Sequence, residues 1–387
     1  MAQQHLDPTD PAAEPVGVDA LADYLRAQAT EFLRALRQHR ESGAGAHGVN
    51  GSEGSVDAAR ALRRAARRIS GTLHTFQAVL DADWAESMRP ELAWLSGTLA
   101  LEHAYASRLE RLLQALHRLS GSSAFPAQST RPPAPSPRPP ASARPPAQPA
   151  DRSAGADGDA GPGAAHPAAA DRGNLTVGAA KAGALLDRRL TLARTRAHST
   201  ALQALGSSRF HAVADKVAVL ASEVPLATGT GAAAGRARPA AADLRPLAAA
   251  AAERLADAVA ALPLITAGSP YNAEALVYGL SPDPAPHPQD APWHQVRLLL
   301  RLHRYAREVL LGQDAPVDVR LLAAGQALDR HRDASEAAAA AAQAARTPRI
   351  APATAYALGV LHADQRHEVE AARYAFQSCW RKETVGT

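Results

Sequence analysis

An all-α fold is predicted from three features of the sequence. No segment shows the strict alternation of apolar and polar residues that marks a half-buried strand. Many segments instead repeat apolar residues every three or four positions, as one face of a helix requires. Aromatic residues make up only 4% of the 387 residues, so the core must be built largely from Leu, Val and Ala, which favours helices.

The expected helices each follow from a stripe of apolar residues bounded by Gly, Pro or polar loops. In the first of them, Leu21, Leu25, Phe32 and Leu36 are spaced for one face. A loop rich in Gly and Ser separates this helix from the next. The helices are expected at 18–40, 56–80, 85–98, 101–119, 181–205, 209–221, 244–262, 293–311, 317–345 and 353–382.

Two segments are not expected to fold. The N-terminus, residues 1–17, has no apolar periodicity, and residues 121–173 contain "RPPAPSPRPPASARPP" followed by a run rich in Gly, Ala and Asp. Such compositions cannot bury enough apolar surface to offset the entropy of ordering, so both segments are predicted to be disordered. The second is interpreted as a linker, and alternatively as a ligand for a protein partner that reads proline-rich segments.

Charge, cysteine content and the absence of long apolar runs indicate in which compartment the protein is expected. The net charge is +4 and the isoelectric point about 9.4, so the chain is mildly basic. Cys379 is the single cysteine, which excludes an intramolecular disulfide and favours a reducing compartment. The sequence starts without the charged and apolar pattern of a secretory signal, and no run is apolar and long enough to span a bilayer. A cytoplasmic location without a membrane partner is therefore expected.

A basic stripe is predicted on the helix at 293–311. At about 100° per residue, its cationic side chains fall on one narrow edge, away from the apolar residues and together with a single carboxylate. The stripe consists of His294, Arg297, Arg301 and Arg304, with Glu308.

The helix at 56–80 repeats the pattern in a matching register, with Arg60, Arg63, Arg67, Ser70 and His74. This match indicates an internal repeat. Five arginines and no acidic residue lie between Ala58 and Leu80, so like charges one turn apart repel by roughly 1–2.5 kcal/mol in total. Acidic neighbours, solvent and salt, or a polyanionic ligand could each relieve this repulsion.

These residues resemble a known family, the conserved-histidine α-helical domain, or CHAD. Its second-repeat signature, a His followed by basic residues at +3, +7 and +10 and by Tyr at +11, matches His294 to Tyr305. A further family element, Leu-Gly-x-His-x-Asp, is matched by "LDRHRD", with Asp329 in place of Gly. The resemblance spans about 18–382 apart from the proline-rich insert.

The resemblance implies two four-helix repeats that form a helical bundle around a central basic pore. The first repeat would be residues 18–120, and residues 174–387 would hold the remainder, including the second repeat. The sequence departs from the family where Arg60 replaces the first signature histidine and Ser70 replaces an arginine. We therefore expect a divergent member whose anion site is thinned.

The function implied by the resemblance is non-catalytic binding of inorganic polyphosphate, with no cofactor, and association with polyphosphate granules in the cytoplasm. Nucleic acid is not expected as a partner, because no aromatic residues alternate with the arginines. The alternatives are a binder of nucleic-acid backbones and a degenerate helical scaffold that binds proteins. No catalytic or metal site is expected. The implied polyphosphate-binding residues are Arg60, Arg63, Arg67, Arg68, His74, His294, Arg297, Arg301, Arg304, Tyr305 and His331.

Overall fold

The structure is a computed structural model that describes residues 15–44, 49–121, 167–227, 243–269, 276–277, 279–280, 287–312 and 315–381. The predicted all-α fold is confirmed: within these ranges every long element is a helix, and extended pairing is limited to one isolated β-bridge between Leu80 and Leu226. The expected disorder of residues 1–14 and of 122–166 lies outside the described residues. None of the helices in the described ranges has the length and apolar character needed to cross a bilayer.

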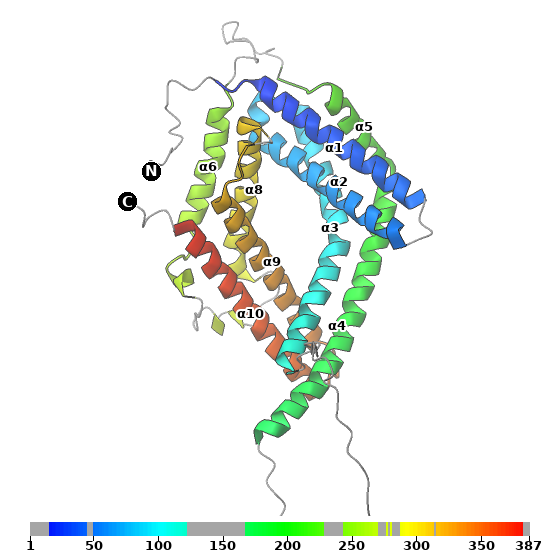
Figure 1. The fold of residues 1–387 in the computed structure, drawn as a ribbon, viewed down its shortest axis with the longest axis vertical. Helices are drawn as coiled ribbons and strands as arrows, with labels where there is room; N and C mark the ends of the chain where they lie inside the picture. Colours follow the sequence, from blue (N-terminus) through cyan, green and yellow to red (C-terminus); the bar gives the residue numbers. More distant parts are fainter. Residues whose placement is uncertain are drawn as a thin grey trace, which may run out of the picture.

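Nine α-helices make up the described part of the chain (Figure 1). They are α1 (Val18–Ala44), α2 (Val49–Thr75), α3 (Ala82–Leu119), α4 (Pro167–Leu205), α5 (Ser208–Ser222), α6 (Arg245–Ala260), α8 (Ala291–Leu311), α9 (Val319–Ala345) and α10 (Pro352–Arg381). Three short 3-10 helices are also present: η1 (Gln77–Val79) lies before α3, and η3 (Thr266–Gly268) and η4 (Pro288–Asp290) lie between α6 and α8. Helix α4 begins inside the segment that was expected to be a linker up to Gly173.

The helices expected at 85–98 and 101–119 are one continuous helix, so that prediction was wrong. Gly97 lies close to the expected boundary, but inside a helix glycine costs only about 1 kcal/mol relative to alanine. Leu95 and Leu99, on either side of it, are buried in the core. The Thr98 hydroxyl donates to the carbonyl of Trp94 within the same helix, at 2.9 Å. Burial of the flanking leucines therefore outweighs the local cost.

Two groups of helices are joined by α3 and α4, which run side by side (Figure 1). One group, α1, α2 and α5, shares a core with the first half of α3 around Phe32, Ile69 and Phe210. The other, α6, α8, α9 and α10, packs around Trp293 and Phe376. A third core, at the far end of α3 and α4, fills with short side chains of α9 and α10. This arrangement brings α2 against α8, the two helices with basic stripes.

Candidate anion-binding site

A basic cluster lies where α2, α8 and α9 meet. We define it as Arg63 and Arg67 of α2, Arg297 and Arg301 of α8, and Arg332 of α9. On α2 the core face is fixed by buried Leu62, Ala66, Ile69 and Leu73, and on α8 by Trp293, Val296 and Leu300. The four stripe arginines stand beside these faces and are partly buried. Two stripes that are far apart in the sequence thus form one group of charges.

Burial and mutual repulsion lower the pKa values of arginines in the basic cluster. Burial, followed by the charges of Arg63 and Arg301, lowers the pKa of Arg67 to about 9. Burial, followed by the charges of Arg332 and Arg301, lowers the pKa of Arg63. A guanidinium group does not give up its proton near neutral pH. The cluster therefore stays charged, and burial and mutual repulsion destabilise this charged form.

Acidic neighbours neutralise part of the basic cluster only. Asp329 forms an ion pair with Arg297, and Asp333 forms one with Arg332. Burial works to lower the pKa of Arg332, but Asp333 and Glu336 raise it above its ordinary value. Arg63, Arg67 and Arg301 form no ion pair with any described residue. Three adjacent guanidinium groups are thus left without a carboxylate.

A cavity of about 680 Å³ opens beside Arg67 and Arg301, between α2, α3 and α8. Its polar lining includes the predicted residues His74 and Tyr305. The further polar residues of the lining are Ser70 of α2 and Glu86, Arg89 and Ser96 of α3. Burial, then Arg89 and Arg254, lowers the pKa of His74. The cavity thus presents several cations and hydrogen-bond donors to one space, together with one carboxylate, Glu86, which pairs with Arg89 at 3.0 Å.

Close packing of α2 on α8 fixes one wall of this cavity. Gly71 of α2 faces Tyr305 of α8, and a Cβ at Gly71 would lie 2.7 Å from Cδ2 of the tyrosine ring. Such a distance is a steric overlap, so only glycine permits this approach. The ring stands beside Arg67 and Arg301, whose charges act to lower the pKa of Tyr305, although burial leaves it raised.

Arg68 and Arg304 are predicted site residues that lie next to the basic cluster rather than within it. Arg68 forms an ion pair with Glu308, at 2.9 Å. The hydroxyl of Tyr24 donates to the same carboxylate at 2.8 Å, so Glu308 links α1, α2 and α8. Arg304 lines a separate cavity of about 260 Å³ together with Arg68 and Glu308. Like Arg63, it has no ion pair with a described residue.

Arg60 and His294 lie at the margins of the cluster. Arg60 is exposed and pairs with Asp57 at 3.2 Å. Its Nη2 lies 3.4 Å from Nδ1 of His103 on α3. His294 is partly buried, and its ring meets that of His331 edge-on, with centroids 5.5 Å apart. Burial lowers the pKa of His294. The charge of Asp290 acts to raise this pKa, and the charge of Arg297 lowers it further.

His331 is placed outside the basic cluster, in a buried polar network centred on Asp290. Arg373 donates from Nε to Nε2 of His331 at 3.3 Å and from Nη2 to Asp290 at 2.7 Å. The imidazole stacks on Trp293. Burial, followed by Arg373, lowers the pKa of His331 to about 3, so the ring is neutral at pH 7. Only 1% of this residue is exposed, which leaves no surface for a phosphate chain.

Arg332 and His103 belong to the site although the sequence analysis did not propose them for it. The charge of Arg332 helps to lower the pKa of Arg63. Burial, followed by the charges of Arg60 and Arg63, lowers the pKa of His103. The sequence signal for Arg332 was present in the basic run "RHR" on α9, one position after His331. Nothing in the sequence of α3 placed His103 opposite Arg60, because that contact depends on how α3 packs on α2. Among the described residues, no group of His, Cys, Asp or Glu is arranged to hold a metal ion.

Comparison with known proteins agrees with this architecture. The solved structure of PptA from Streptomyces chartreusis is 63% identical, with a TM-score of 0.69, and the match covers 95% of this chain and all of that one. A search of curated proteins finds no match. The family model of the CHAD domain matches residues 27–340, which is most of the chain. The chain therefore belongs to the CHAD domain family.

Proposed function

We propose that the chain binds inorganic polyphosphate, without chemical change, through the basic cluster and the cavity beside it. One observation carries the proposal: Arg63, Arg67 and Arg301 converge from two helices without an acidic partner among the described residues. A linear polymer with one negative charge per phosphate would neutralise all three at once. Membership of the CHAD family supports the same ligand.

The roles of the residues follow from their positions. Arg67 and Arg301 would donate to phosphate oxygens inside the cavity, and Arg63 and Arg297 would hold the chain where it leaves the cavity. A hydrogen bond to a charged group contributes about 1.5–3 kcal/mol, well above the value of an exposed ion pair. His74 would donate an N–H at the cavity wall. Together these groups would form the basic pore that the family resemblance implies.

A nucleic-acid backbone offers the same phosphate oxygens and is the second candidate. Base stacking needs exposed aromatic rings next to the cations. Within the described part of the chain, Tyr305 is the aromatic residue that lines the cavity, and its ring is packed against Gly71. Polyphosphate, which has no bases to stack, therefore fits this site better.

Filter-binding of long-chain polyphosphate against single-stranded DNA of equal charge tests the proposal. We expect polyphosphate to bind more tightly at each salt concentration. Affinity should fall with salt, and the slope of log K against log salt should decrease by somewhat under one unit for each arginine removed, as for other single-stranded polyanions. Equal binding of DNA, or no binding of polyphosphate, would reject it. Release of phosphate during incubation would reject the non-catalytic part.

A further inference from the structure

Asp329 of α9 lies against the basic cluster and pairs with one of its arginines. Nε and Nη2 of Arg297 on α8 both lie 2.5 Å from the same oxygen of this carboxylate. No other described residue forms an ion pair with Arg297. The proposed function assigns Arg297 to the ligand, so this arginine has two competing partners. A phosphate group that accepts from Nε and Nη2 of Arg297 must replace Asp329.

The two side chains of this ion pair differ in their access to water. The side chain of Asp329 is 57% exposed, whereas that of Arg297 is 17% exposed. A displaced Asp329 is hydrated by the solvent around it, and ion pairs with an exposed partner contribute little to stability. Arg297 is mostly shielded from water and needs another anion in place of the lost carboxylate. Asp329 therefore gives way to a phosphate group more readily than to water.

Glu308, the acidic residue in the stripe of α8, is held more firmly. Its carboxylate pairs with Arg68 at 2.9 Å and accepts a hydrogen bond from the hydroxyl of Tyr24 at 2.8 Å. The side chain of Glu308 is only 23% exposed. Displacing it would leave partly buried groups of α1 and α2 without their acceptor. Glu308 therefore serves the packing of the helices, and Asp329 is the carboxylate that a ligand can replace.

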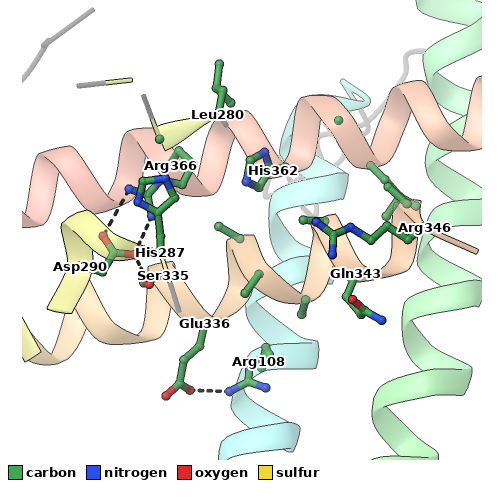
Figure 2. A pocket seen from close by; sticks show the side chains of 18 of the residues that line it. Arg108, Leu280, His287, Asp290, Ser335, Glu336, Gln343, Arg346, His362 and Arg366 are labelled. Carbon is green, nitrogen blue, oxygen red and sulfur yellow. Dashed lines mark hydrogen bonds and ion pairs between the residues drawn. The ribbon is translucent and has the colours of Figure 1, made fainter. Parts of the chain in front are cut away.

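Asp329 is the first of three carboxylates on one edge of α9. Asp333 and Glu336 follow it at spacings of four and three residues. Asp333 pairs with Arg332 of the same helix. Glu336 pairs with Arg108 of α3, at the edge of a separate cavity of about 800 Å³ (Figure 2). Within the described part of the chain, Asp329 is thus the member of this edge that pairs with an arginine of α8.

The charge of Asp329 acts on more than one arginine of the basic cluster. Burial, followed by the charge of Arg301, lowers the pKa of Arg297, and Asp329 acts against this effect. Asp329 also acts to raise the pKa of Arg63 on α2 and that of Arg332 on α9. One carboxylate thus offsets part of the repulsion between cations from three helices.

We propose that Asp329 is a built-in competitor of polyphosphate, which holds Arg297 without a ligand, gives way to a phosphate group, and thereby sets the affinity of the site. The inference rests on the proposed function, because it concerns the same basic cluster. The apparent affinity is reduced in proportion to the fraction of molecules in which Arg297 is free. Asp329 pairs with Arg297 again when the polymer leaves, so it also keeps binding reversible.

Filter-binding of long-chain polyphosphate to Asp329→Asn tests this competition. Asparagine keeps the size of the side chain but has no charge with which to hold Arg297. Affinity should rise by about tenfold, the value of one charged hydrogen bond. The slope of log K against log salt should steepen by somewhat under one unit, because one further arginine neutralises a phosphate. Unchanged or lower affinity in this variant overturns the proposal.

Asp215→Asn is the matched control for the loss of one negative charge. Asp215 is exposed on α5, a helix that packs on α1, α3 and α4. Salt screens charges that are separated by more than about 8 Å, so this substitution should change polyphosphate affinity by less than about twofold. A gain equal to that of Asp329→Asn would overturn the proposal, since net charge alone would then explain it.

A double-mutant cycle shows whether Asp329 acts through Arg297. The Arg297→Gln protein has no ion pair to break, so adding Asp329→Asn should raise its affinity by no more than about threefold. A gain as large as in the parent overturns the proposal. Urea unfolding checks that each variant is folded. If the parent does not bind polyphosphate, the proposed function fails and this inference with it. If the parent binds and Asp329→Asn binds no better, this inference alone fails.

Discussion

Arg301 on α8 lies close enough to Arg67 on α2 to lower the pKa of Arg67, and both side chains line the same cavity. Neither forms an ion pair with a described residue. Two like charges held together at a cavity wall make the unliganded protein less stable than its packing alone would allow. An anion in the cavity removes this cost, so ligand binding and stability are coupled through these two residues.

Replacing Arg67 by Gln should therefore have opposite effects on stability and on binding. Without a polyanion, the variant should unfold at a higher urea concentration than the parent, because repulsion from Arg63 and Arg301 is removed. Its affinity for polyphosphate should fall by about tenfold, the value of one charged hydrogen bond. Arg64→Gln, at an exposed position on the same helix, is the control for both measurements. A less stable Arg67→Gln protein would show that the charge serves the fold.

Gly71→Ala should weaken polyphosphate binding through the position of Tyr305. The added methyl group overlaps the tyrosine ring and must displace it from its position near Arg67 and Arg301. Overpacking of this kind costs about 1–3 kcal/mol, which urea unfolding would measure. Gly97→Ala is the matched control. Nothing lies within 4 Å of its Cβ position, so the substitution should stabilise α3 by up to about 1 kcal/mol and leave binding unchanged. A stable Gly71→Ala protein with parental affinity would contradict this account.

Apolar periodicity predicted most of the fold because each helix buries one face. The prediction failed at α3, where Gly97 lies between Leu95 and Leu99. A boundary was expected after residue 98, whereas both leucines are buried and α3 continues through it. The ends of helices were also placed only approximately, as for α4, which begins well before Lys181.

Helical spacing predicted which cations share an edge of α2 or α8. It did not predict which of these cations form an ion pair with an acidic side chain. Glu308 was expected to stand beside Arg304 on its own helix, and it pairs instead with Arg68 of α2. Arg332 enters the cluster through the packing of α9, which periodicity on α2 or α8 cannot reveal. The family pattern named His331 without distinguishing a ligand-binding imidazole from one packed on Trp293. Neighbours across helices decide each of these outcomes.

The hydrogen bond from Tyr24 to Glu308 should make stability depend on alkaline pH. Burial, then the charge of Glu308, raises the pKa of Tyr24 above its ordinary value of 10.0. A raised pKa favours the protonated form in the folded state, so this contribution is complete below pH 10.0 and decreases above it. Tyr24→Phe should lose stability at neutral pH and show a shallower alkaline decline in urea unfolding. A parallel decline in both proteins would assign the alkaline effect to another group.

His331 should make the protein sensitive to mild acid without changing polyphosphate binding. Its pKa falls from 6.5 to about 3 on folding, so the unfolded chain takes up a proton that the folded chain refuses. Its contribution to stability is therefore complete above pH 6.5 and is lost progressively toward pH 3. Burial acts to raise the pKa of Asp290, but the hydrogen bond and the charge of Arg366 lower it to about 2. Asp290 therefore also makes the folded state less stable in acid, but only below its ordinary pKa of 3.8.

Urea unfolding at several values between pH 7 and pH 4 separates these groups. His331→Gln keeps an acceptor for Nε of Arg373 but cannot take up the proton, so its stability should fall less steeply over this range than that of the parent. His294→Gln is the comparison, since that ring borders the basic cluster and its loss should weaken polyphosphate binding. The opposite outcome would be that His331→Gln loses polyphosphate binding and keeps the parental dependence of stability on pH. The imidazole would then contact the ligand, and the role assigned to it beside Trp293 would be wrong.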